Sequence, residues 1–138
     1  MDLLVIGGQG GGIGKQVVAA VKREFPQLKV TAVGTNSAAT SAMLKAGADE
    51  AATGENPVVV CCRKADLIVG PIGIVIADAL LGEITPKMSA AVGQSRARRI
   101  LIPVNHCDNR IVGVPDLSVG KLVEGVLEEI RKALGETD

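Results

Sequence analysis

The stretch GGQGGGIGK, residues 7–15, decides the fold that we expect of this chain. It follows an apolar run at residues 3–6, which predicts a strand buried on both faces. It opens a segment in which apolar residues recur every four positions, at Ile13, Val17, Val21 and Phe25, which predicts an amphipathic helix that ends before Pro26. A helix that begins in this way offers unpaired N–H groups and the positive end of its dipole to an anion. The stretch therefore indicates a phosphate-binding loop.

The composition fits one compact domain over residues 1–138, with 47% hydrophobic and 22% charged residues. Fifteen Lys and Arg balance fifteen Asp and Glu, and Phe25 is the only aromatic residue, so we expect no binding to nucleic acid. The start of the chain lacks the pattern of a signal peptide, and no apolar run reaches transmembrane length. Three cysteines, two of them adjacent, cannot form a framework of paired disulfides, which agrees with a reducing compartment. We expect a cytoplasmic protein without a membrane partner.

Strand and helix patterns alternate along the rest of the chain. Strands are expected at residues 28–33, 48–53, 67–69 and 100–104, with an edge strand at 110–114. Helices are expected from Asn36 or Ser37 to 46, and at 57–65, 74–81, 86–94 and from 116 onward. This alternation predicts an α/β protein with a three-layer Rossmann-like fold, in which right-handed crossovers join a mostly parallel sheet covered by helices on both faces.

The glycine spacing predicts the class of ligand. The pattern G-x-x-x-G-I-G is formed by Gly8, Gln9, Gly10, Gly11, Gly12, Ile13 and Gly14. It is a variant of the dinucleotide fingerprint, whose glycines permit a tight turn, close approach of a pyrophosphate and helix–strand packing. A glycine-rich turn without a ligand is the alternative, although five closely spaced glycines carry an entropic cost in a simple connector. We expect a nucleotide, NAD or NADP, as the small-molecule partner.

The usual partner of this fingerprint is missing from the second strand. Rossmann sites place Asp or Glu about 20 residues after the glycines to hold the ribose hydroxyls. This chain has Gly34, Thr35 and Asn36 there. Asn36 could hydrogen-bond a ribose, and Thr35 or Ser37 could contact a phosphate. No Arg beside them argues for NADP, so the sequence leaves the choice between NAD and NADP open.

Two enzyme classes with similar loops are disfavoured. The G-x-x-x-G-I-G form resembles that of short-chain dehydrogenases, but their catalysis relies on a Tyr-x-x-x-Lys pair and this chain contains no tyrosine. A P-loop needs glycine at position 9 and a magnesium-binding hydroxyl after Lys15, where Gln9 and Gln16 stand.

Further candidate residues follow the other strands, because ligands of open parallel sheets lie at the carboxyl ends of the strands. The turn after the strand at 67–69 consists of Gly70, Pro71, Ile72 and Gly73. Gly70 and Gly73 would let backbone approach a ligand, and Gly73 is expected to begin a helix that could bind a second anion; a simple proline-glycine turn is the alternative. The weak catalytic candidates are His106, whose solution pKa is near neutrality, and Glu55.

Two other groups of residues contain side chains that could form a site. Zinc-ligand atoms are present at Cys61, Cys62, His106 and Cys107, but no C-x-x-C pair occurs, so we expect no metal. A second group surrounds Gly82, between two expected helices, and consists of Asp78, Glu83, Thr85 and Lys87. It could be a mobile, substrate-facing lid or a capped interhelical turn.

Seven motifs together give the chain a recognisable pattern: GQGGGIGK at 8–15, GTN at 34–36, MLKAGA at 43–48, ATGEN at 52–56, GPIGI at 70–74, GEITPKM at 82–88 and ILIPVN at 100–105. In these motifs the chain resembles the domain of unknown function 3842 family, small bacterial proteins with a Rossmann-like pattern. The resemblance spans most of the chain. It implies the glycine loop and the fold, and it carries over no reaction or catalytic residue.

Three functions are compatible with these patterns. The first is a nucleotide-binding protein that uses the glycine loop. The second is a small nucleotide-dependent oxidoreductase or transferase in which His106 or Glu55 acts. The third is an oligomeric regulatory or assembly protein that has no ligand. Because the chain has little length for a separate substrate domain, we expect a homo-oligomer that completes its site from a neighbour.

Overall fold

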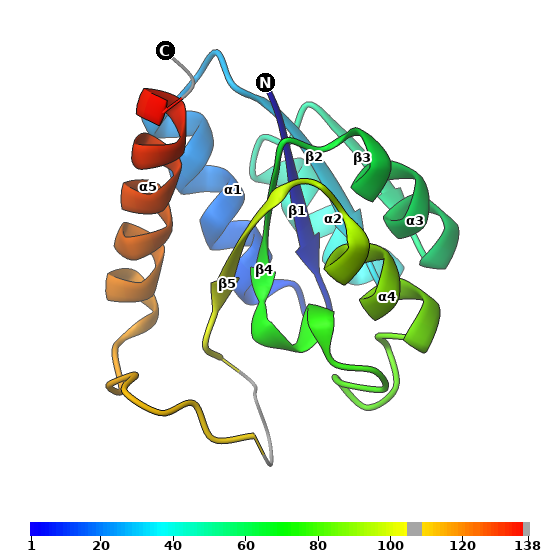
Figure 1. Ribbon diagram of the computed structural model, residues 1–138. Coiled ribbons are helices and arrows are strands. Elements are labelled where there is room, and N and C mark those ends of the chain that lie inside the picture. Colours follow the sequence, from blue (N-terminus) through cyan, green and yellow to red (C-terminus); the bar gives the residue numbers. More distant parts are fainter. Residues whose placement is uncertain (105–108, 137–138) are drawn as a thin grey trace.

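The computed structural model describes residues 1–104 and 109–136 (Figure 1). Among these residues, five strands form one all-parallel sheet in the order β3-β2-β1-β4-β5. The strands are β1 (Asp2–Gly7), β2 (Lys29–Gly34), β3 (Glu50–Thr53), β4 (Leu67–Pro71) and β5 (Arg98–Ile102). The expected parallel sheet is confirmed.

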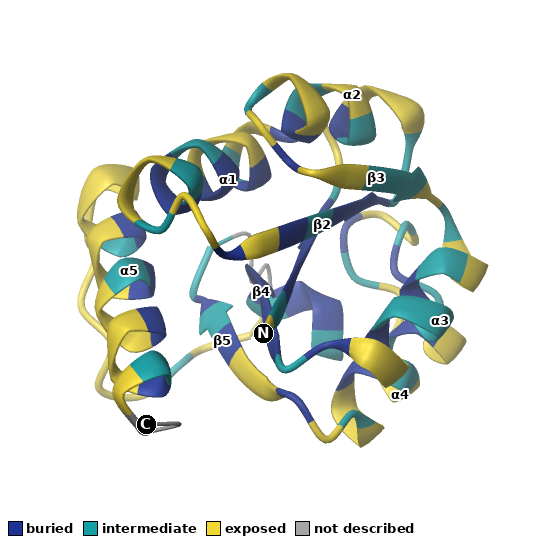
Figure 2. Ribbon diagram, turned by 90° about the horizontal axis from the view of Figure 1, so that it is seen from above, coloured by how far each residue is buried: buried dark blue, intermediate teal, exposed yellow. Residues whose placement is uncertain are grey.

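Helices cover both faces of the sheet. They are α1 (Gly12–Glu24), α2 (Ser37–Lys45), α3 (Glu55–Lys64), α4 (Pro86–Gln94) and α5 (Val119–Glu136), with a 3₁₀ turn η1 (Ile72–Val75) after β4. One face packs against α1, α2 and α5, and the other face packs against α3, α4 and η1 (Figure 2). The three-layer Rossmann-like prediction is therefore confirmed. None of the described helices combines the length and the apolar character needed to cross a membrane.

Strand β1 explains why its sequence is apolar at successive positions. Leu3 and Val5 lie in the core beneath α1, α2 and α5, whereas Leu4 and Ile6 lie in the core beneath α3 and α4. All four side chains are fully buried. Because successive side chains of a strand point to opposite faces, a central strand covered on both faces must be apolar throughout.

The order of the strands reverses beside β1. From β1 the chain adds β2 and β3 on one side, and α3 then returns it to β4 and β5 on the other side. Crossovers in one direction place α1 and α2 on one face, and crossovers in the opposite direction place α3 and α4 on the other, as crossovers of a single hand require. The carboxyl ends of β1 and β4 flank a topological switch point, where ligands of open α/β sheets bind.

The prediction of a helix at residues 74–81 is wrong. Residues 72–75 form only the 3₁₀ turn η1, and the chain then turns repeatedly up to Ile84. Asp78, Leu80 and Leu81 have φ of 65°, 57° and 56°, which a right-handed helix excludes. Leu80 and Ile84 are buried in the core beneath α3 and α4. The segment is therefore apolar because it packs against the sheet, and not because it forms a helix. We call residues 76–85 the cover loop.

Other boundaries also differ from expectation. Residues 110–114 form no strand and include a turn at Gly113, where φ is 82°. Helix α3 begins at Glu55 behind Gly54, two residues before the start that Asn56 and Pro57 indicated. The last helix begins at Val119 instead of residue 116, and the strand expected at 100–104 is found as β5.

Candidate functional site

The glycine loop, residues 8–14, turns directly from β1 into α1. Gln9 and Gly11 have φ of 49° and 75°, and the N–H of Gly11 donates to the carbonyl of Gly8 at 2.9 Å, which closes the turn. A Cβ on Gly11 would lie 2.9 Å from the Cα of Ala39, at the start of α2. Position 11 therefore needs glycine both for its backbone conformation and for the close approach of a second helix.

The remaining glycines around the loop are either packed or open. A Cβ on Gly7 would lie 3.1 Å from the Met43 side chain, and a Cβ on Gly14 only 2.7 Å from its Sδ, so these two glycines permit close packing of β1, α1 and α2. A Cβ on Gly10 or Gly12 would meet no described atom within 4 Å. Packing therefore does not require glycine at these two positions, which leave open space on the outer side of the loop.

Helix α1 begins without a side-chain cap among the described residues. Its N-cap is Gly11, and its first turn contains no acidic residue. By contrast, Asn36 caps α2 and Thr85 caps α4 through side-chain oxygens. Helix α3 also begins without a side-chain cap from the described residues, behind Gly54, but its first turn contains the acidic Glu55. The first N–H groups of a helix have no partner within the helix. At α1 such groups would be available to an anion beside the glycine loop.

A carboxylate from the cover loop lies against the glycine loop. Oε1 of Glu83 accepts hydrogen bonds from the N–H of Gln9 at 2.8 Å, from Nδ2 of Asn36 at 3.1 Å and from the hydroxyl of Thr35. The bond from Thr35 is the main cause that lowers the pKa of Glu83 below its usual 4.5; the Gln9 and Asn36 bonds lower it too, against partial burial. Glu83 is therefore an ionised, oriented carboxylate near neutral pH.

Thr35 and Asn36 join the glycine loop, as their position after β2 predicted. The N–H of Thr35 donates to the carbonyl of Gly7 at 2.9 Å. Nδ2 of Asn36 also donates to the carbonyl of Gln9 at 2.8 Å, while its Oδ1 accepts from the N–H of Ala39 at 2.9 Å. Asn36 thus caps α2 and ties the end of β2 to the glycine loop. Its contact with a ribose stays a prediction.

The turn after β4 is closed by the chain itself. A Cβ on Gly70 would lie 2.8 Å from the carbonyl oxygen of Ile6, and one on Gly73 would lie 3.2 Å from the Cβ of Ala79 in the cover loop. Gly70, Pro71 and Gly73 are buried, and Ile72 is half-buried. Because η1 has only four residues, the helix that Gly73 was expected to begin, and with it a second helix N-terminus for an anion, is absent.

Glu55 holds the other end of the cover loop. Its Oε2 accepts a hydrogen bond from the hydroxyl of Thr85 at 2.5 Å, and Thr85 Oγ1 accepts from the N–H of Met88 at 3.2 Å. Glu55 therefore links the start of α3 to the cap of α4. Its catalytic role stays a prediction, and His106, the other catalytic candidate, lies outside the described residues.

Residues 2–135 match the model of a family described as a domain of unknown function, DUF3842. The chain belongs to the DUF3842 family. This match confirms the resemblance that the seven motifs carry. No curated protein matches the chain in sequence.

One solved structure resembles the DUF3842 chain in shape. It is the dodecameric FMN-dependent Ubix-like decarboxylase from Escherichia coli O157:H7, with a TM-score of 0.44 and 14% sequence identity over 93% of each chain. The cofactor and the assembly are those of that enzyme, and we draw nothing from them for this chain.

The contact of Glu83 with the glycine loop was not predicted from the sequence. No acid follows β2 in the DUF3842 sequence, and the carboxylate that reaches this place comes from 48 residues beyond Thr35. The sequence did single out Glu83 as part of a lid or turn around Gly82. Only the packing of the cover loop across the carboxyl edge of the sheet brings it to the glycine loop.

The described cysteines lie on α3. Burial is the main cause that raises the pKa of both thiols, that of Cys62 to about 11, so both are protonated and weakly nucleophilic near neutral pH. No three His, Cys, Asp or Glu side chains gather as metal ligands within residues 1–104 and 109–136. His106 and Cys107, the remaining members of the metal hypothesis, lie outside these ranges.

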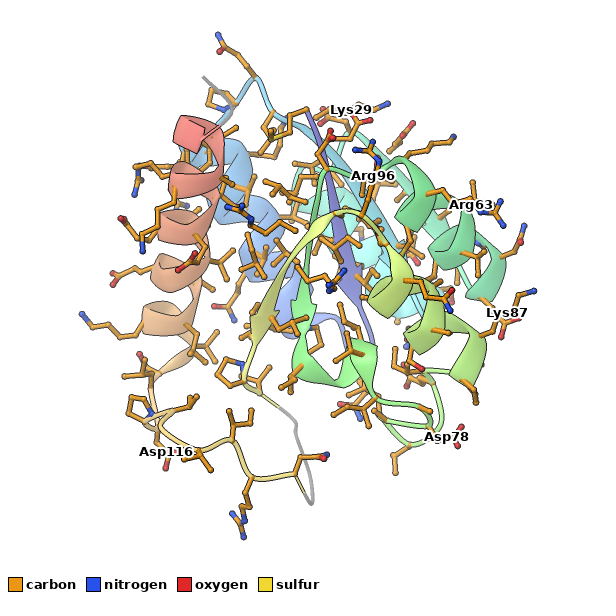
Figure 3. All side chains as sticks on the ribbon, in the orientation of Figure 1. Lys29, Arg63, Asp78, Lys87, Arg96 and Asp116 are labelled. Atoms are coloured by element: carbon orange, nitrogen blue, oxygen red, sulfur yellow. The ribbon has the colours of Figure 1, made fainter. Side chains whose placement is uncertain are left out.

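A groove of about 490 Å³ lies between α3 and α4. Three cations, Arg63, Lys87 and Arg96, are on this side of the molecule and border the groove (Figure 3). Its other lining residues are Val59, Cys62, Ala90, Ala91, Gln94 and Ser95. None of the residues predicted to bind a nucleotide lines it, so the groove and the glycine loop are separate candidate sites.

Proposed function

We propose that this DUF3842 protein binds a nucleotide, with the dinucleotides NAD and NADP as the favoured class, and holds its phosphates over residues 10–14. The observation that carries the proposal is that α1 starts without a side-chain cap from the described residues and that Gly10 and Gly12, at this start, face open space. Phosphate oxygens there would accept hydrogen bonds from the first N–H groups of the helix and gain from its dipole. The site adjoins the topological switch point, where α/β sheets bind such ligands.

The composition of the loop favours a dinucleotide over a magnesium-bound triphosphate. Lys15 is exposed and is followed by Gln16, which offers no hydroxyl to a magnesium ion. The packed glycines, Gly7 and Gly14, bring β1 and α1 together in the way that the dinucleotide fingerprint uses. The open glycines, Gly10 and Gly12, leave room for a pyrophosphate to approach the backbone. The residues present therefore fit the phosphate part of NAD or NADP.

A thermal-shift screen against NAD, NADP, FAD, ATP, GTP and sugar nucleotides tests the proposal. A nucleotide supplied at one hundred times its Kd should raise the free energy of unfolding by about 2.7 kcal/mol. Gly12→Val should abolish this shift, because its side chain would fill the space that the phosphates need. Gly125→Val is the matched control, since Gly125 is also a helical glycine that faces open space. The proposal is wrong if no nucleotide raises the melting temperature, or if Gly12→Val keeps the shift.

We also propose that the protein forms a homo-oligomer. Val112 is 98% exposed, and two further apolar side chains close to it in the sequence, Val114 and Leu117, are 43% and 49% exposed. Single exposed apolar side chains are normal on a monomer, so the proposal rests on these three together, which lie within six residues of the chain. Light scattering after gel filtration should give a mass of at least two chains, and Val112→Ser should lower it. A monomer that retains bound nucleotide would contradict this expectation.

A further inference from the structure

We propose that Glu83 is the ribose-binding acid of this site and makes it select NAD over NADP. The inference rests on the proposed function, because it concerns the same nucleotide. It replaces the conclusion from sequence that the end of β2 offers no acid. The acid is supplied by the cover loop, from the other side of the switch point.

The position of the carboxylate supports this role. In Rossmann sites the acid that binds the ribose hydroxyls stands at the end of the second strand. Here β2 ends at Gly34, and both following residues, Thr35 and Asn36, donate hydrogen bonds to Oε1 of Glu83. The carboxylate thus lies at the end of β2 although its backbone belongs to a different segment.

The third donor connects Glu83 to the phosphate cradle. The N–H of Gln9 donates to the same oxygen at 2.8 Å, and Gln9 is the immediate neighbour of Gly10. In a dinucleotide the adenosine ribose is bonded directly to the pyrophosphate. An acid held beside the first open glycine is therefore where a ribose would lie when the phosphates bind over residues 10–14.

One oxygen of the carboxylate remains available. All hydrogen bonds that the described residues donate to Glu83 go to Oε1, which leaves Oε2 without a partner among them. An ionised carboxylate is an acceptor at both oxygens, and the vicinal hydroxyls of a ribose are donors. The three bonds to Oε1 fix the direction of the group, and Oε2 is the atom that we expect to accept from the ribose.

Gly8 and the ends of the cover loop hold this arrangement. A Cβ on Gly8 would lie 2.8 Å from Cδ1 of Leu80 and 3.1 Å from Oε1 of Glu83, so glycine at this position lets the carboxylate approach the loop. Ile84 is buried next to Glu83, and Thr85 is bonded to Glu55. The fold itself therefore holds the carboxylate in position.

Selectivity follows from charge. NADP carries an additional phosphate on the adenosine ribose, and binding it here would bring that phosphate close to the ionised carboxylate. No ion pair among the described residues includes Glu83, so no described cation is paired with it to offset the repulsion. Placing like charges against the wrong ligand is a common means of discrimination.

Isothermal titration calorimetry with NAD and with NADP, at one salt concentration and neutral pH, tests the inference. The wild-type protein should bind NAD at least about tenfold more tightly than NADP, which corresponds to 1.4 kcal/mol. Glu83→Gln, which keeps the shape of the side chain, should weaken the binding of NAD and bring the Kd values for NAD and NADP closer together. Asp78→Asn is the matched control: it removes one negative charge from the same loop, at an exposed position whose φ of 65° asparagine tolerates (Figure 3). It should leave the ratio of Kd values unchanged.

The outcomes separate the inference from the proposed function. Equal Kd values for NAD and NADP, or a preference for NADP, in the wild-type protein would overturn the role of Glu83 while leaving nucleotide binding in place. An unchanged ratio in a folded Glu83→Gln variant would do the same. Binding of neither dinucleotide would show that the proposed ligand class itself is wrong. The wild-type ratio decides the inference even if the variant does not fold.

Discussion

The glycine-rich turns after β1 and after β4 flank the same switch point, yet they differ in what their glycines do. The turn after β1 leads into the 13-residue helix α1, and Gly10 and Gly12 face open space. The turn after β4 leads into a four-residue 3₁₀ turn, and Gly70 and Gly73 lie against Ile6 and Ala79. Two glycines of the first turn face open space, whereas the glycines of the second turn allow neighbouring parts of the chain to pack closely. A glycine after a parallel strand can therefore serve the packing of the chain itself, and only a glycine with open space beside it is a candidate for contact with a ligand.

The largest effect on stability should come from adding a methyl group to the closed turn. Gly70→Ala would place Cβ 2.8 Å from the backbone oxygen of Ile6, which cannot move without disturbing β1. We expect the free energy of unfolding to fall by about 2 kcal/mol, in the range of overpacked cores. Gly10→Ala, in the open turn, should change it by no more than about 0.5 kcal/mol. Urea unfolding measures both, and equal losses in the two variants would remove the distinction between the turns.

A smaller change in stability should appear with pH. Glu83 belongs to the cover loop, which follows the closed turn, and its hydrogen bonds tie this loop to the open turn. Its pKa in the folded protein is lowered, chiefly by the hydrogen bond from Thr35. The stabilisation is therefore complete above the unfolded pKa, near the usual value of 4.5, and is lost as the pH falls through the lowered folded value. Glu83 is half-buried, so we expect the loss to stay within about 1 kcal/mol.

Urea unfolding at pH 7 and pH 3 of the wild-type protein and of Glu83→Gln measures this loss. The variant should be less stable at pH 7 and should approach the wild-type protein at pH 3. Asp49 also has a lowered pKa, mainly through the N–H of Val30 and then through Lys22, so some loss of stability in acid should persist in the variant. Identical pH dependence in the two proteins would mean that the bonds to Glu83 add nothing to stability.

The smallest effect should come from relieving the backbone of the cover loop. Leu81 is 97% exposed and has φ of 56°, a conformation that leucine adopts unfavourably. Leu81→Asn should raise the free energy of unfolding by about 0.5 kcal/mol, since asparagine tolerates this region and little packing is lost. Leu80 has the same backbone conformation as Leu81 but is buried, so Leu80→Asn should lower the free energy of unfolding instead of raising it. A loss of stability in Leu81→Asn would indicate that its side chain contacts another molecule.

Local patterns predicted much of this fold correctly. The order of strands and helices through β4 followed from apolar runs and from cap residues such as Asn36, and Thr85 likewise indicated the start of α4, because these signals depend on neighbours in the sequence. The helix prediction for residues 74–81 was wrong because an apolar run does not show whether it packs as a helix or as irregular chain. The left-handed backbone at Leu80 and Leu81 has no sequence signal of the kind that glycine or asparagine gives.

The candidate site was predicted only in part for a related reason. The side that we propose to bind phosphate is encoded in consecutive residues, so the glycine loop and its junction with Thr35 and Asn36 could be expected from the sequence. Its acid is not encoded nearby, since Glu83 reaches the loop by a contact across 74 residues, to Gln9. Contacts of this range depend on how the cover loop packs, which no local pattern describes.

The central claim is that the open turn after β1 binds the phosphates of a nucleotide. A titration of ¹⁵N-labelled protein with NAD, followed by amide chemical shifts, tests it most directly. We predict that the largest shifts occur at the amides of Gly10, Gly12, Ile13 and Gly14, with smaller changes at Gln9 and Asn36. Shifts confined to Gln94, Ser95 and Arg96, in the groove between α3 and α4, or no shifts at all, would contradict the claim.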